Sequence, residues 1–169
     1  MINSVKLKEV FFEDVDFGGM RSEVIGTTII VYCCGWVFTH LFLGLSGIEE
    51  VFLSVAIVYT IFTWSGSRKT CTTFNPAIAL TLGLFRRNSW VNTLYFIICQ
   101  LVASILGASI LKMLSPNAQL AKVKKSGFLG FPRLPSDSHT IQSLGLIFSL
   151  ELIGTFLVVL MYYLCIVCP

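Results

Sequence analysis

Apolar stretches long enough to cross a lipid bilayer restrict the fold of this chain more than any other feature. Residues 24–45 contain no Asp, Glu, Lys or Arg, and about 20 apolar residues form a membrane-spanning helix. Three further apolar stretches cover residues 51–66, 90–114 and 144–168. Only 12% of the residues are charged, against about 25% in soluble proteins. The sequence therefore predicts an all-α membrane protein with four spans.

A fifth apolar stretch, residues 76–85, is too short to cross the membrane. As a helix it would reach ~15 Å, half of a ~30 Å hydrocarbon core. Basic pairs flank it on both sides, and such pairs prefer the cytoplasmic face. These pairs are Arg68/Lys69 and Arg86/Arg87. We therefore expect residues 70–85 to form a re-entrant loop and half-helix, which is tolerated in a membrane where its backbone lines a wet cavity or is buried in protein.

The sequence contains a weak internal repeat. Residues 23–31 and 151–159 share five of nine positions, including Glu23/Glu151, Gly26/Gly154 and Thr27/Thr155. Three predicted spans lie between the starts of the two copies, so the second copy would be inverted in the membrane. Inverted repeats are typical of transport folds.

Asn75, Pro76 and Ala77 open the predicted half-helix. Asn is a favoured N-cap, and Pro suits the first helical position because it has no N–H to leave unpaired. The positive end of the half-helix would then point to the membrane midplane and repel cations, while the Asn amide donates to a passing water. The alternative is an ordinary helix start in a loop.

Glu23, Gln100 and Glu151 are polar side chains in predicted spans or directly beside them. Glu23 and Glu151 are carboxyls that cost about 2.5–3.5 kcal/mol to insert, so each is expected to have a partner or a role in a pathway. One role is to accept hydrogen bonds from the N–H groups of a re-entrant loop, and Gln100 would cap the same loop. The alternative is a Glu close enough to a helix end to reach water. Small residues permit close helix packing along the third span: Ala103, Gly107 and Ala108.

Together these motifs resemble the major intrinsic protein family, the aquaporins and aquaglyceroporins. They are Glu23-x-x-Gly26-Thr27, Asn75-Pro76-Ala77, Gln100 and Glu151-x-x-Gly154-Thr155-Phe156. The resemblance implies that Glu23, Gln100 and Glu151 brace re-entrant loops. It also implies that Asn75, Pro76 and Ala77 line a pore. The other pore-lining residues would be Val55, as the filter residue of the second helix, and four residues through their carbonyls: Thr70, Cys71, Thr72 and Thr73.

The chain departs from the family pattern at several points. Thr70 to Thr73 replace the usual Ser-Gly-Ala-His, and Ala79 stands where Ser or Thr is common. No second Asn-Pro pair occurs, so the chain corresponds to a channel truncated after its fourth span. We expect residues 1–22 to be a cytoplasmic N-terminal segment, residues 115–143 a loop, and residues 23–169 an incomplete inverted-repeat bundle.

The predicted function is that of a channel polypeptide for passive transport of water or small neutral solutes, not conducting by itself. One alternative is a non-conducting membrane subunit that regulates full-length channels; another is an antiparallel pair of identical chains. The expected partners are the lipid bilayer, these solutes, and related channels in a homo- or hetero-tetramer. Without clustered basic residues, catalytic groupings or metal-binding spacing, we expect no nucleic acid, enzymatic activity, cofactor or metal.

Overall fold

The computed structural model describes residues 15–67, 72–117, 119 and 141–164. The chain divides into two units, Met1–Leu114 and Ser115–Pro169. The described residues form helices and contain no strand, so the predicted all-α fold is confirmed. The helices are α2 (Phe17–Phe42), α3 (Ile48–Ser67), α4 (Pro76–Leu84), α5 (Trp90–Leu114) and α7 (Ile141–Tyr162). All but α4 are long and apolar enough to cross a membrane.

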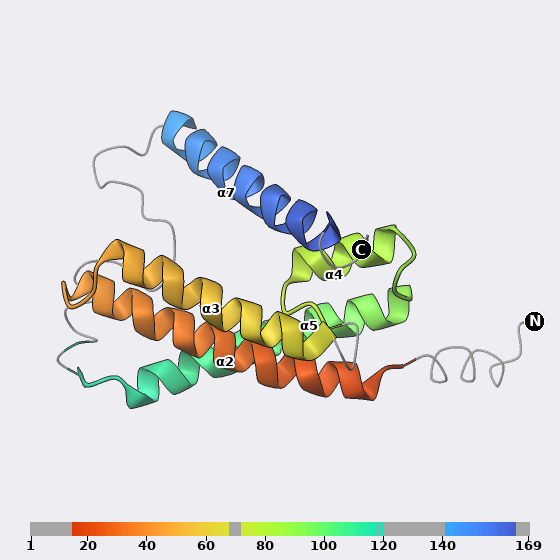
Figure 1. Ribbon diagram of the computed structural model, residues 1–169, viewed down its shortest axis with the longest axis horizontal. Coiled ribbons are helices and arrows are strands. Elements are labelled where there is room, and N and C mark those ends of the chain that lie inside the picture. The colour runs from red at the N-terminus through yellow and green to blue at the C-terminus, as the bar shows by residue number, and fades with distance from the viewer. Residues whose placement is uncertain (1–14, 68–71, 118, 120–140, 165–169) are drawn as a thin grey trace, which may run out of the picture. The chain divides into compact units, whose positions relative to one another are not determined.

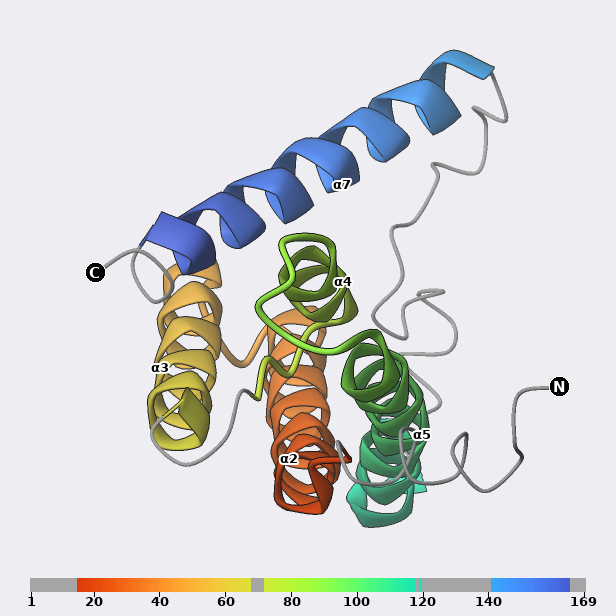
Figure 2. The ribbon, with the colours of Figure 1, turned by 90° about the vertical axis from the view of Figure 1, so that its right-hand side faces the viewer.

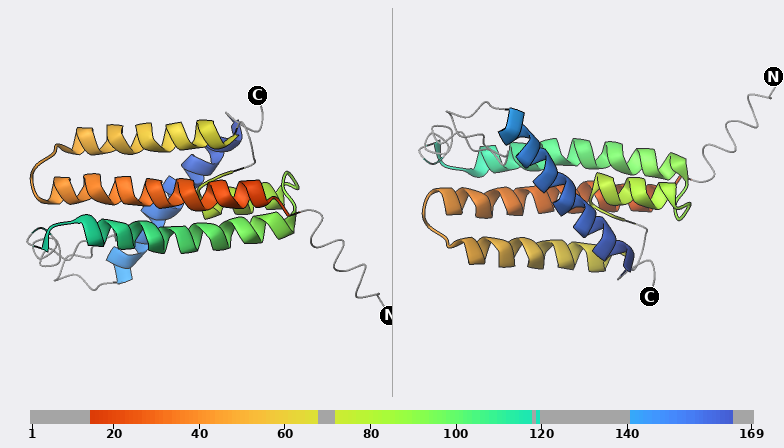
Figure 3. Two further views of the ribbon diagram at one scale, coloured as in Figure 1. Left: turned by 90° about the horizontal axis from the view of Figure 1, so that it is seen from below. Right: turned by 90° about the horizontal axis from the view of Figure 1, so that it is seen from above.

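In the first unit, α2 lies between α3 and α5 and packs against both (Figures 1 and 2). The short α4 packs on α5, at the end of the unit where α5 begins (Figure 3). The second unit contains α7.

The α2–α5 contact is close because α5 presents small residues to α2. Ala103 and Gly107 are buried, one helical turn apart. A Cβ added at Gly107 would lie 2.6 Å from the backbone oxygen of Thr28. The Thr28 hydroxyl donates to the Val24 carbonyl of its own helix at 2.7 Å and also lies 3.3 Å from the Ala103 carbonyl on α5. Ala108 is exposed, so only two of the three predicted small residues lie in this seam.

Local capping explains why α2 differs from the predicted span of residues 24–45. It begins seven positions earlier because Asp16 is its N-cap, with the Asp16 carboxylate accepting from Gly19 N at 2.8 Å. It ends at Phe42 because Gly44 adopts a φ of 70°, where a glycine carries no steric penalty. The apolar pattern continues to Leu45, but the helix does not.

The remaining bounds differ less from the predictions. Helix α3 begins before residue 51. Glu49 and Glu50 lie in its first turn, where negative side chains stabilise the positive end of a helix. Helix α5 has the predicted bounds of residues 90–114. Helix α7, Ile141–Tyr162, begins three residues before the predicted span of residues 144–168, and residues 165–168 of that span lie outside the described residues. Most of the predicted loop 115–143 lies outside the described residues.

Candidate functional site

The segment before α4 turns the chain sharply into the half-helix. Asn75 is the N-cap of α4 in an extended conformation, and its Oδ1 accepts from Ala77 N at 2.9 Å. Pro76 is the first residue of α4. Because Oδ1 is used by the cap, Nδ2 of Asn75 is the part of this amide that can donate to a solute.

The carboxyl of Glu23 accepts hydrogen bonds from the backbone of this turn. Glu23 lies on α2 and is completely buried. Its Oε1 accepts from Thr73 N at 2.5 Å, and its Oε2 accepts from Phe74 N at 2.9 Å. These N–H groups belong to no helix, so without Glu23 they would be buried donors without partners, which is costly in an apolar surrounding.

Gln100 completes this network from α5. Its Nε2 donates to Oε2 of Glu23 and to Oγ1 of Thr73, each at 2.9 Å. The Thr73 hydroxyl in turn donates to Oε1 of Glu23 at 3.1 Å. Both carboxyl oxygens thus face donors only, as suits an acceptor-only carboxylate. The network joins α2, α5 and the turn before α4.

Phe74 is a structural residue of the turn that the sequence reasoning did not identify. Its φ is 52°, which is uncommon for a bulky residue, and it is buried. A Cβ added at Gly26 on α2 or at Gly66 on α3 would clash with the Phe74 ring. The ring also makes an edge contact with Phe62 on α3, with centroids 6.2 Å apart. Phe74 therefore fills the space that these two glycines leave open.

The other predicted pore residues of the first unit lie in different environments. Thr72 and Thr73 are completely buried, Val55 on α3 and Ala77 on α4 are partly buried, and Pro76 is exposed. The Thr73 carbonyl accepts from the hydroxyl of Tyr59 at 3.3 Å, a contact that was not predicted. Thr70 and Cys71 lie outside the described residues.

Glu151 lies on α7 in the second unit, and its side chain is exposed. Three residues further along, a Cβ added at Gly154 would meet open space. In the first copy of the repeat, by contrast, Glu23 is buried and Gly26 contacts Phe74. The loop-bracing role of Glu151 therefore stays a prediction.

Comparisons with known proteins identify the family. A family model described as "Major intrinsic protein" matches residues 17–167. The chain belongs to the major intrinsic protein family. It is 30% identical to a probable NIP-type aquaporin of Nicotiana alata over 111 residues. This alignment covers 60% of the present chain and 39% of the relative. It is 28% identical over 136 residues to aquaporin A of Dictyostelium discoideum, which covers 75% of this chain and 45% of that protein. No solved structure matches.

The chain is thus an integral, multi-pass membrane protein of the major intrinsic protein family. The chain spans less than half of the length of the curated relatives that it matches. The braced turn and α4 both lie within the matched residues.

Proposed function

We propose that the turn at residues 72–77 and the start of α4 form one half of a pathway for water or small neutral solutes. The observation that supports this most is the Glu23 carboxyl, which binds the Thr73 and Phe74 N–H groups ahead of α4. With the N–H groups directed to Glu23, the carbonyls of the turn can face a solute, and the Thr73 carbonyl, which accepts from Tyr59, keeps a second lone pair for this. Nδ2 of Asn75 adds a donor, and the positive end of α4 disfavours cations.

Residues 1–169 supply one such half, because they contain a single Asn-Pro pair. We therefore propose that a polypeptide of these residues alone does not conduct, and that a second half-helix from elsewhere completes the pathway. The N-terminus is assigned to the cytoplasmic side, from the basic pairs on both sides of α4.

Osmotic swelling of liposomes tests this proposal directly. Liposomes that hold only the purified chain should swell no faster than empty liposomes. Liposomes that also hold the complementary C-terminal half of a full-length family member should swell faster. Rapid swelling with the chain alone would contradict the proposal. The proposal would also be contradicted if liposomes that hold both polypeptides swell no faster than liposomes that hold only the C-terminal half.

Glu151 favours a second candidate function, that of a subunit which associates with related channels and alters their activity. An exposed carboxyl on a membrane-spanning helix is costly unless it finds a partner, and Glu151 is exposed on α7. Assembly into homo- or hetero-tetramers belongs to this candidate. Co-expression with a full-length relative tests it: failure to co-purify, together with an unchanged water flux of the relative, would argue against association.

A further inference from the structure

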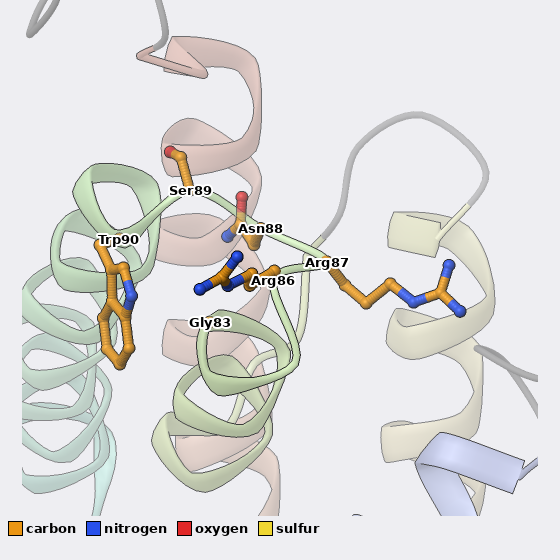
Figure 4. A pocket seen from close by; sticks show the side chains of 6 residues that line it. All are labelled: Gly83, Arg86, Arg87, Asn88, Ser89 and Trp90. Atoms are coloured by element: carbon orange, nitrogen blue, oxygen red, sulfur yellow. The ribbon is translucent and has the colours of Figure 1, made fainter.

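A pocket of about 540 Å³ lies at the turn that joins α4 to α5, away from the Glu23 network. It is lined by Gly83, Arg86, Arg87, Asn88, Ser89 and Trp90. Figure 4 shows the Arg86 guanidinium beside the Asn88 amide above Gly83, whereas the Arg87 side chain extends away from both. The volume of the pocket is within the range of small-ligand sites, about 300–1,000 Å³. The proposed pathway makes no use of this pocket.

The pocket contains several hydrogen-bond donors. Nδ2 of Asn88 is buried and has no acceptor within the described part of the chain. Oγ of Ser89 accepts from Asn92 N at 3.2 Å, so the Ser89 hydroxyl proton is left to donate. Arg86 adds a guanidinium, which can bind two oxygens of one phosphate. A buried donor without a partner indicates a missing acceptor.

The charges around the pocket favour an anion. All six lining residues are neutral or basic. The positive end of α5, a helix of 25 residues, begins at Trp90 directly beside it. Asp16 contacts Asn92 through its backbone N–H, but its carboxylate accepts from Gly19 N and does not line the pocket.

Arg86 occupies a backbone position that suits glycine better. It follows the C-terminus of α4 with a φ of 56°, and its N–H donates to the Gly83 carbonyl. Glycine adopts this left-handed conformation without steric cost, and helices commonly end with it. An arginine in this backbone conformation is consistent with a binding role for its guanidinium.

The surroundings of the pocket favour lipid over free phosphate as the source of such an anion. Leu84 and Phe85 directly precede Arg86 and are 62% and 60% exposed. Trp90 is 50% exposed and begins a membrane span, and tryptophan is enriched at the level of lipid headgroups. The pocket thus combines hydrogen-bond donors that suit a phosphate with neighbouring apolar side chains that can lie against acyl chains.

We propose that this pocket binds the phosphate of an anionic phospholipid, with Arg86, Asn88 and Ser89 as donors and Trp90 at the glycerol level. Basic pockets at the cytoplasmic ends of membrane helices recognise such headgroups. The site involves neither Glu23 nor Asn75, so it does not depend on solute conduction.

Native mass spectrometry of the full detergent-solubilised chain can test this, with added phosphatidylserine or phosphatidylcholine. The chain should retain phosphatidylserine preferentially. Arg86→Gly should reduce that retention about tenfold, the loss expected for one charge-assisted hydrogen-bonded contact. The same variant should melt no lower than the parent chain, because glycine suits the backbone at this position. Arg21→Gln is the matched control, because Arg21 is an exposed cation on α2.

Three results would overturn the proposal: no preference for phosphatidylserine, an equal loss in Arg86→Gly and Arg21→Gln, or no loss in either. If Arg86→Gly does not fold, Asn88→Ala removes the unpaired donor and should give the same selective loss. Inorganic phosphate separates the two sources of phosphate. If millimolar phosphate displaces phosphatidylserine as readily as added anionic lipid does, the site binds free phosphate and the assignment to lipid is wrong.

Discussion

Nε2 of Gln100 on α5 lies 2.9 Å from Oε2 of Glu23 on α2, and the two side chains meet where the turn before α4 enters the unit. Neither side chain is exposed. The pair therefore joins the packing of two membrane helices to the shape of a non-helical segment. A change at either residue should alter both.

The first prediction concerns the acceptor. Glu23→Gln replaces one carboxyl oxygen by an amide that faces N–H groups, so at least one buried donor loses its acceptor. The free energy of unfolding should fall by about 1–3 kcal/mol, and by more in Glu23→Ala. Denaturation in mixed micelles measures this, with Glu49→Gln on the exposed start of α3 as control. Equal effects at Glu23 and Glu49 would show that the network does not stabilise the fold.

The second prediction uses the internal repeat as its own control. Gly26→Ala places a methyl group against the Phe74 ring and should destabilise the chain by about 1–3 kcal/mol. Gly154→Ala, the equivalent change in the second copy, meets open space and should be neutral or slightly stabilising, because alanine favours helix. The double variant Gly26→Ala/Phe74→Ala should lose less than the sum of the single changes. Additive losses would contradict the proposed contact.

The third prediction separates the two roles of Asn75. Asn75→Ala removes the cap on Ala77 N and should cost about 1 kcal/mol of stability. Asn75→Asp keeps an acceptor at the positive end of α4 and should retain stability. Because it lacks Nδ2, it should still reduce swelling of the complemented liposomes. If Asn75→Asp conducts like the parent assembly, the Asn75 amide is a cap and not a pore donor.

The fourth prediction tests the α2–α5 seam. Gly107→Val would push a side chain onto the Thr28 carbonyl and should lower stability by about 1–3 kcal/mol. Ala108→Val, the neighbouring position, is exposed and should change stability by less than about 0.5 kcal/mol. Thermal unfolding in one detergent compares the two. A larger loss at Ala108 would mean that the helices pack through a different face.

Hydropathy and motif spacing were sufficient to predict the all-α membrane fold and the family, both of which are confirmed. Helix ends were harder, because a membrane span and a helix need not coincide. Asp16 extends α2 beyond the apolar stretch, and Gly44 ends it before the stretch does. Both residues are ordinary capping signals, but hydropathy averages do not register them.

The turn itself was only partly visible in the sequence. The sequence predicted that Glu23 accepts from N–H groups of a re-entrant loop, with Gln100 at the same loop. It did not indicate which backbone N–H groups these are, because a backbone N–H carries no sequence signature; the structure shows those of Thr73 and Phe74. Phe74 was missed because it reads as one more apolar residue in an apolar chain. A better signal would have been the glycines at positions 26 and 66, which leave space on two different helices. Only the folded chain shows that one ring occupies both spaces.

Cysteine labelling of the chain in sealed vesicles tests the central claim most directly, after the six native cysteines are replaced. Single cysteines are introduced at three positions. These are Ser67 (the end of α3), Arg87 (after α4) and Gly47 (between α2 and α3). A membrane-impermeant reagent should label positions 67 and 87 from the same side and position 47 from the opposite side. Labelling of positions 67 and 87 from opposite sides would show that the segment between them crosses the membrane, which would contradict the re-entrant turn and the proposed half-pore.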